Sequence, residues 1–226
     1  MLAQLDRSVH ILYYYQMPSP EIILLAGAPG SGKSSIADRF VELGLVEGSQ
    51  HLDIGDLKRS IESGERPSAY AELLKQKEHP DRVTGAAPSA AMTGIMEEFI
   101  LERPDGLTIV GGFPRYMDRV APFKESMVHI GANVLALCVV ELSDESILRE
   151  RLSNRAERAG QKLKDPVARL RDHNENIVPT LEVLAQDYPR HSLDGTLSLD
   201  TNARALLDIY QLYSRQAGPT DAELKI

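Results

Sequence analysis

A glycine-rich segment near the start of the chain has the residue types of a phosphate-binding loop. The stretch GAPGSGKS, residues 27–34, satisfies the pattern G-x-x-x-x-G-K-[ST]. Its glycines let successive backbone N–H groups turn toward an anion, and a following helix adds its positive end. Lys33 would reach the outer phosphates of a nucleoside triphosphate, and the Ser34 hydroxyl would bind Mg²⁺. The expected binding residues are Gly27, Ala28, Pro29, Gly30, Ser31, Gly32, Lys33, Ser34 and Ser35.

The segments on either side of this loop predict the elements that position it. Residues 21–26 form a short apolar run typical of a buried strand, and residues 34–44 have the apolar spacing of a helix. Further strands are expected within residues 48–56, 107–112, 133–142 and 196–200, and helices over 56–63, 68–77, 89–103, 144–158, 165–187 and 203–213. Alternation of strand and helix predicts a three-layer α/β/α fold with a five-stranded parallel sheet.

Composition excludes several classes of partner. The chain has 226 residues and a formal net charge of −8, which argues against a nucleic-acid polymer or an anionic membrane. Its longest apolar run, residues 134–140, is far shorter than a membrane span. The single cysteine, Cys138, lies in that run and is expected to be a buried apolar group. We expect a cytoplasmic protein whose residues 1–20 form a loosely docked or disordered extension.

Four segments after the loop resemble, in order, the motifs of adenylate kinase and its relatives. They are HLDIGDLKR (51–59), GGFPRYMDR (111–119), RERLSNR (149–155) and RLRDHNENIVP (169–179). The similarity extends from about residue 21 to residue 200, and four ordered motifs are far more specific than the loop alone. The resemblance implies a P-loop kinase of nucleoside monophosphates with ATP and Mg²⁺ as cofactors.

The same resemblance implies roles for five arginines. Arg59 and Arg115 would bind the phosphate of the acceptor, and Arg151 would lie against ATP. Arg155 and Arg169 would meet the charge that develops on the phosphoryl group during transfer. Arginine suits these tasks because its planar fork binds phosphate bidentately and keeps its charge. The expected catalytic residues are Lys33, Arg115, Arg155 and Arg169, and the expected substrate-binding residues are Asp53, Ile54, Arg59, Gly112, Arg115 and Arg119.

The resemblance also implies a division of the chain. Residues 51–103 would form a small helical subdomain that binds the monophosphate, and residues 152–166 a short lid over ATP. The lid is too short for a zinc site and has no cysteine, although Arg158, Lys162 and Lys164 can supply positive charge. The core would comprise residues 21–50, 104–151 and 167–226, and we expect a monomer.

Gly111 departs from the family pattern, because relatives have an aspartate there that orients the water shell of Mg²⁺. Asp53, at the end of the second expected strand, is the best candidate for a replacement carboxylate and, with Ser34, for a metal ligand. That placement resembles shikimate and adenylylsulfate kinases, where an aspartate at this point serves metal or substrate. The alternative is that Asp53 is only a turn or helix-capping residue beside Asp56.

Arg119 stands where adenylate kinases carry a glutamine that reads the adenine of AMP. Arginine only donates hydrogen bonds, so it suits guanine O6 and N7 or a pyrimidine carbonyl better than adenine. Ile54 replaces a threonine and removes a hydroxyl from the same pocket. We therefore expect an acceptor other than AMP to be preferred. The alternative is that Arg119 pairs with a carboxylate such as Asp118 or Glu125.

Two other functions fit parts of the sequence. A kinase of a small-molecule hydroxyl would use Asp53 as base or metal partner, but it has less need of two arginines facing an acceptor phosphate. A nucleotide-binding protein without turnover would explain Gly111 and the short lid, but not the retention of Lys33 and Arg115. The histidines have no ligand-like spacing, and structural roles are expected for them.

Overall fold

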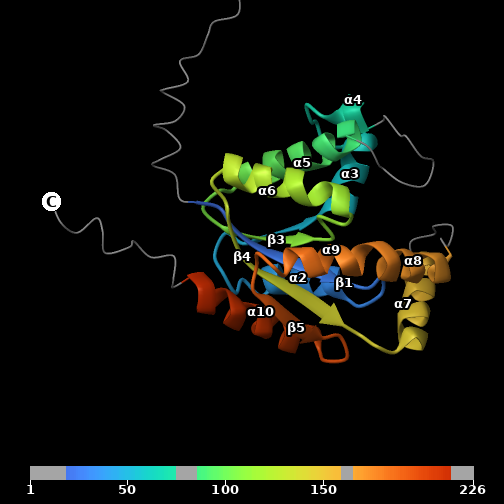
Figure 1. Cartoon of the computed structure of the whole chain (residues 1–226). Helices are drawn as coiled ribbons and strands as arrows, with labels where there is room; N and C mark the ends of the chain where they lie inside the picture. The colour runs from blue at the N-terminus through green and yellow to red at the C-terminus, as the bar shows by residue number, and fades with distance from the viewer. Residues whose placement is uncertain (1–18, 75–85, 159–164, 215–226) are drawn as a thin grey trace, which may run out of the picture.

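The computed structural model describes residues 19–74, 86–158 and 165–214 (Figure 1). Most of the expected N-terminal extension therefore lies outside the described residues. Within them, five strands form one all-parallel sheet with the order β2-β3-β1-β4-β5. The strands are β1 Glu21–Gly27, β2 Gln50–Asp53, β3 Leu107–Gly111, β4 Asn133–Glu141 and β5 Arg190–Asp194. The predicted five-stranded parallel sheet is confirmed.

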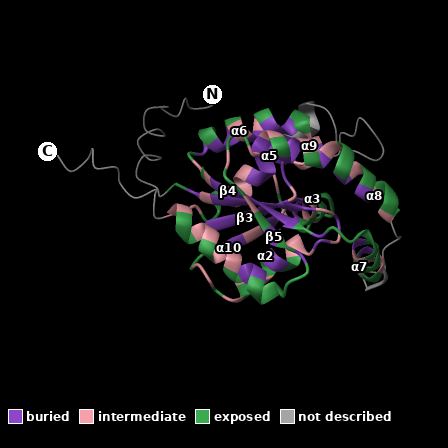
Figure 2. Cartoon of the chain, turned by 60° about the horizontal axis from the view of Figure 1, so that its bottom comes forward, coloured by how far each residue is buried: buried purple, intermediate pink, exposed green. Residues whose placement is uncertain are grey.

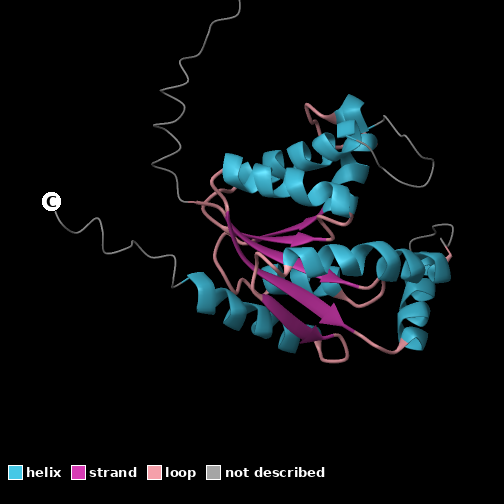
Figure 3. Ribbon diagram, viewed as in Figure 1, coloured by secondary structure: helices cyan, strands magenta, loops and turns pink. Residues whose placement is uncertain are grey.

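Helices cover both faces of the sheet, as Figure 3 shows. The α-helices are α2 Lys33–Glu42, α3 Ile54–Glu62, α4 Ala71–Leu74, α5 Ala86–Leu101, α6 Val120–His129, α7 Glu145–Arg158, α8 Pro166–Asp172, α9 Val178–Leu184 and α10 Leu199–Ser214. A 3₁₀ turn, η1, spans Met117–Arg119, and a π-helical segment, η2, spans His173–Ile177 between α8 and α9. The predicted helix over residues 165–187 is therefore broken by η2.

The two layers of core follow from the alternation of side chains along the strands. On β1, Ile22 and Leu24 pack with α3, α5, α6 and α9, whereas Ile23 and Leu25 pack with α2 and α10. A strand that is apolar at every position must be covered on both faces, because successive side chains point in opposite directions. Figure 2 shows the strands buried between these helices. Cys138 lies in this core as expected, and burial raises the pKa of its thiol to about 12.

The fifth strand lies earlier in the chain than the sequence indicated. Residues 190–194 pair with β4, whereas residues 196–200, the predicted strand, form a turn and the start of α10. Thr196 donates its backbone N–H and its hydroxyl to Asp194, at 2.8 and 2.6 Å. Ser198 accepts from the backbone N–H of Thr201 at 3.1 Å and so caps α10. Side-chain hydrogen bonds to the local backbone outweighed the alternating apolar pattern.

The fold brings the carboxyl ends of β1, β2 and β3 to one edge of the sheet. In this family of open parallel sheets, ligands bind beyond that edge. The backbone N–H of Gly112 donates to the carbonyl of Leu25 at 3.3 Å, which ties the end of β3 to β1. No helix of the described segments is long and apolar enough to cross a membrane.

Candidate active site

Residues 27–34 form a tight turn between β1 and α2, and its shape depends on glycine. Gly30 has φ +88°, and a Cβ there would lie 2.7 Å from the carbonyl oxygen of Leu148. Gly32 has φ +95° and precedes the first residue of α2, where it has no side chain to cap the helix. The first N–H groups of α2 are therefore available to an anion, which the helix dipole also favours. The hydroxyl of Ser31 is buried inside the turn without a hydrogen-bond partner among the described residues.

Ser34 and Asp53 meet beside this turn. The Ser34 Oγ donates to Asp53 Oδ2 at 2.9 Å, joining the start of α2 to the end of β2. The other oxygen of Asp53 accepts from the backbone N–H groups of Gly55 and Asp56 at 2.9 and 3.2 Å, so Asp53 is the N-cap of α3. Burial raises the pKa of Asp53, but the hydrogen bonds from Ser34, Asp56 and Gly55 outweigh it and the pKa is lowered. The carboxylate is thus ionised, and it caps a helix while facing Ser34.

The helix that the sequence predicts over residues 56–63 starts earlier in the structure. The helix begins two residues earlier, at Ile54, and Asp56 lies in its first turn. The earlier start follows from Asp53, whose side chain reaches two backbone N–H groups at once. Ile54 is 7% exposed and packs in the core rather than standing in solvent.

A groove of about 900 Å³ opens in front of the glycine turn. Its walls come from the turn and α2, from the end of β2, from α3 and from α7. Lys33, Ser34, Asp53, His51 and Arg151 all border it. Arg151 donates from Nη1 to the carbonyl of Gly195 at 3.3 Å, which holds its guanidinium beside the glycine turn. The volume and the charged lining suit a nucleoside triphosphate.

Lys33 and Arg115 come together at a second, small cavity of about 20 Å³. It is also lined by Gly112, by Pro114 and by apolar residues of η2 and α9. Both cations lie close enough to His173 to lower the pKa of its imidazole, after burial, to about 4. Lys33 and the arginine that follows β3 therefore share one corner of the structure.

His173 is a buried neighbour of this corner, and the sequence analysis expected only a structural role for it. It is 8% exposed, and the charges of Lys33 and Arg115 both act on its imidazole. It opens the π-helical segment η2, and such segments are frequent at functional sites. No local signal marked it, because the register of a π-helix follows from packing rather than from residue type.

Two further arginines, on α3 and in the segment that follows it, are in ion pairs. Arg59, on α3, is exposed and pairs with Asp56 in the same helix. Arg66 was not predicted to be a site residue. It borders the groove, pairs with Glu102, and lies over the ring of Phe99 at 5.2 Å from the centroid. Neither guanidinium contacts the glycine turn in this arrangement.

Arg119 lies in η1 with only 4% of its surface exposed. Its guanidinium carbon is 5.2 Å from the ring centroid of Tyr116, whose hydroxyl donates to Asp172 Oδ2 at 3.1 Å. Burial lowers the pKa of Arg119, whereas the nearby charges of Asp118 and Tyr116 raise it. Asp118, one of the two carboxylates considered as alternative partners, is therefore near enough for its charge to act on Arg119.

The lid residues are only partly described. Arg155 and Arg158 lie on the last turn of α7, but their side chains are outside the described residues, as are Lys162 and Lys164. Arg169 is half-buried on α8. In the part of the chain that the structure describes, no group of three or more His, Cys, Asp or Glu side chains can hold a metal ion. A cation at Ser34 and Asp53 would therefore need phosphate and water oxygens to complete its shell, which is how Mg²⁺ binds in phosphoryl-transfer sites.

The fold and this site define a P-loop protein of the α/β/α type. A family described as "AAA domain" matches residues 26–166. Adenylate kinase isoenzyme 5 from Bos taurus is 29% identical over 177 residues, which are 73% of this chain and 28% of that protein. The adenylate kinase of Mesoplasma florum is 28% identical over 59% of this chain and 58% of its own length. That of Methylorubrum populi is 31% identical over 60% of this chain and 64% of its own length.

The chain therefore belongs to the AAA domain family, and it is similar to proteins named adenylate kinase. It spans little more than a quarter of the isoenzyme 5 proteins that it matches.

Proposed function

We propose that the chain is an ATP- and Mg²⁺-dependent kinase that transfers the γ-phosphoryl group of ATP to a nucleoside monophosphate. The observation that carries the proposal is the shared corner of Lys33 and Arg115 at the end of the glycine turn. A kinase of a small-molecule hydroxyl has less need of an arginine in that place, because the group that it phosphorylates is not itself a phosphate. The similarity to proteins named adenylate kinase supports the same reaction.

The residues of the glycine turn, with Lys33 and Arg151, would bind the triphosphate. Backbone N–H groups of the turn and the positive end of α2 would face the phosphates, and Lys33 would reach the outermost. Ser34 and Asp53, already joined by a hydrogen bond, would hold Mg²⁺, which neutralises phosphate charge when bound. Asp53 is ionised and partly buried, so it fits that task.

Arg115, Arg59 and Gly112 would bind the acceptor, with its phosphate on the two guanidinium groups. Arg155 and Arg169 would neutralise the charge on the group in transit, as in other phosphoryl transfers. Transfer would be direct and in line. Residues 51–103 would close over the acceptor and residues 152–166 over ATP, a motion that frees Arg59 from Asp56.

The proposal also covers the base of the acceptor, the cellular compartment and the oligomeric state. With Ile54 and Arg119 near the acceptor, a base rich in hydrogen-bond acceptors, such as guanine, is preferred to adenine. We place the enzyme in the cytoplasm as a monomer, and its single, buried cysteine is compatible with that compartment.

A kinase of a small-molecule hydroxyl is the second candidate, because Asp53 stands where it can serve as base or metal partner. Both candidates are tested by incubating the protein with ATP, Mg²⁺ and each of AMP, GMP, CMP, UMP and dTMP, and measuring ADP. Production of ADP that depends on a monophosphate, with formation of the matching diphosphate, supports the proposal. Binding of ATP without turnover on any monophosphate would contradict it.

A further inference from the structure

The imidazole of His51 is held rigidly at the wall of the groove. Its Nδ1 lies 2.7 Å from Asp38 Oδ1 on α2, and its side chain is only 9% exposed. Its Nε2 is buried and has no hydrogen-bond partner among the described residues. His51 precedes Asp53 by two residues on β2, so both side chains leave the same face of the strand.

The partner at Nδ1 decides what Nε2 can do. The Asp38 carboxylate is 60% exposed, and an ionised carboxylate only accepts hydrogen bonds. Nδ1 therefore carries a proton in this contact, and in the neutral imidazole the lone pair is then on Nε2. A buried acceptor without a donor costs free energy, so Nε2 requires a donor that no described residue supplies.

Gly111 makes room for this ring. A Cβ on Gly111 would lie 3.1 Å from His51 Nε2, closer than ordinary van der Waals contact. Gly111 and Asp53 are register partners on neighbouring strands, so the ring edge lies at the end of β2 and β3 where the groove begins. Gly111 is not in a left-handed conformation, so its lack of a side chain has a steric reason rather than a conformational one.

We infer that His51 Nε2 accepts a hydrogen bond from a water of the Mg²⁺ shell at Ser34 and Asp53, with Asp38 fixing the ring and Gly111 admitting it. The inference rests on the proposed Mg²⁺–ATP site, but not on the identity of the acceptor. His51 acts as a positioning residue, through the water, and not as a direct metal ligand. The described side chains contain no cluster able to bind the metal alone, in agreement with a contact through water.

Isothermal titration of ATP with and without Mg²⁺ tests this directly, because it needs no turnover. In His51→Asn the side chain is too short to reach the Nε2 position, whereas His51→Gln can place an amide oxygen there. The Mg²⁺ effect is the ratio of the Kd for ATP without Mg²⁺ to the Kd with Mg²⁺. For His51→Asn we expect this ratio to be about 10-fold smaller, with the metal-free Kd unchanged. For His51→Gln we expect at least half of the Mg²⁺ effect, on a logarithmic scale, to return.

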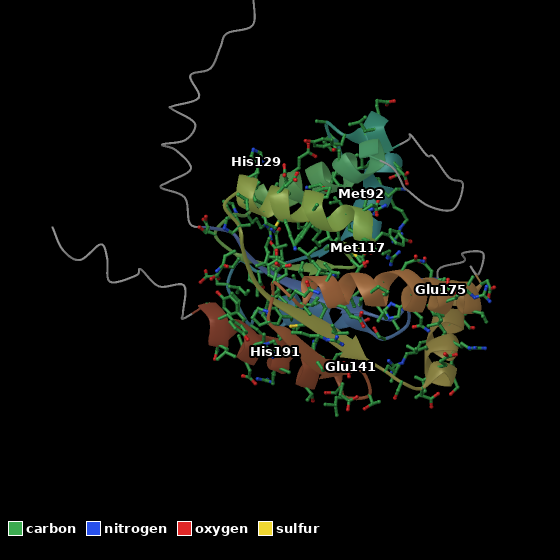
Figure 4. All side chains as sticks on the ribbon, in the orientation of Figure 1. Met92, Met117, His129, Glu141, Glu175 and His191 are labelled. Atoms are coloured by element: carbon green, nitrogen blue, oxygen red, sulfur yellow. The ribbon has the colours of Figure 1, made fainter. Side chains whose placement is uncertain are left out.

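Two outcomes would overturn the inference. One is a full Mg²⁺ effect in His51→Asn, and the other is an equal loss of metal-free and Mg²⁺-dependent binding, which indicates only a structural role. The matched control is His129→Asn, at the end of α6 on the outer surface (Figure 4), which should bind like the unmodified protein. Thermal midpoints of all variants identify any that fail to fold.

A second substitution gives an independent measurement. Gly111→Ala pushes its Cβ toward Nε2 and should displace the ring, reducing the Mg²⁺ effect as His51→Asn does. If both act on one contact, the double variant loses no more than either single variant, whereas separate effects would add. Additive losses would contradict the inference.

The failure of this inference is distinguishable from that of the proposed kinase reaction. Unchanged Mg²⁺ linkage in the His51 variants, together with phosphorylation of a monophosphate by the unmodified chain, overturns only the role of His51. Binding of Mg²⁺–ATP with the predicted linkage, but no turnover on any monophosphate, overturns only the acceptor.

Discussion

The proposed triphosphate side and the proposed acceptor side of the site are built in different ways. The triphosphate side is one continuous turn whose groups are backbone N–H groups, a lysine and a hydroxyl, and Ser34 is already bonded to Asp53. The acceptor side consists of long side chains from separate segments, and Arg59 and Arg66 are paired with Asp56 and Glu102.

Because of this difference, the free-energy cost of ordering the binding groups should differ between the two sides. The turn is held by glycine conformations and close backbone contacts, so little has to be ordered when phosphates bind. Exposed arginines in surface ion pairs gain about 0–1 kcal/mol from each pair, so an incoming phosphate can displace the carboxylates readily. Selectivity is therefore easier to alter on the acceptor side than on the triphosphate side.

The largest effect should come from Lys33→Ala on the triphosphate side. Loss of the only lysine of the glycine turn removes the charge that faces the outer phosphates, and we expect the rate to fall about 10³-fold or more. The measurement is ADP formed with Mg²⁺, ATP and the best acceptor. Lys124→Ala, a surface lysine paired with Asp187, is the control and should keep the unmodified rate. Activity in Lys33→Ala equal to that of the unmodified protein would contradict the proposal that the glycine turn binds the triphosphate.

Arg115→Ala tests the corner where the two sides meet. We expect kcat/KM for the monophosphate to fall about 100-fold because a bidentate phosphate contact is lost, with the Kd for ATP changed about threefold or less. Arg149→Ala is the matched control, since Arg149 lies on the surface of α7 in a pair with Glu145. A loss of ATP binding as large as the loss of acceptor binding would show that Arg115 serves the triphosphate side instead.

Arg119→Gln tests selectivity on the acceptor side. If Arg119 reads the base, the ratio of kcat/KM for AMP to that for the preferred monophosphate should rise about 10-fold, because glutamine also accepts from the adenine amino group. The comparison is Arg66→Gln, because Arg66 also borders the groove and lies over the ring of Phe99. An unchanged ratio in Arg119→Gln would remove this residue from base recognition and leave its contacts with Tyr116 and Asp118 as structural.

The smallest effect concerns stability and His173. Its pKa is about 4 in the folded chain and 6.5 when unperturbed, so between these values the unfolded chain binds more protons. Stability should therefore decrease as pH falls from about 6.5 toward 4. In His173→Gln the side chain at this position does not titrate. Over that pH interval the variant should therefore lose about 1–2 kcal/mol less free energy of unfolding than the unmodified protein does, as measured by urea titrations. Parallel curves for the two proteins would contradict the shift.

Some features of the structure could be predicted from the sequence, and others could not. Lys33, Ser34 and their strand and helix were predictable because the glycine turn, the strand before it and the helix after it are local in sequence. The strand at 196–200 was predicted wrongly, because Asp194 and Ser198 use their side chains on the local backbone. Other contacts connect separate elements of the chain, and no local pattern marks them. They are the charges of Lys33 and Arg115 near His173, the ion pair of Arg66 with Glu102, and the hydrogen bond between His51 and Asp38.

The sequence by itself determined the layer architecture, the phosphate-binding turn and the order of the arginine motifs, because each depends on residue types at short, fixed spacing. Contacts between distant segments, by contrast, set the hydrogen bond between Ser34 and Asp53, the space that Gly111 leaves for His51, and the burial of Arg119 beside Tyr116. The physical reason is that these arrangements depend on the register of β2 against β3 and on the packing of η1, which are set by contacts between distant segments.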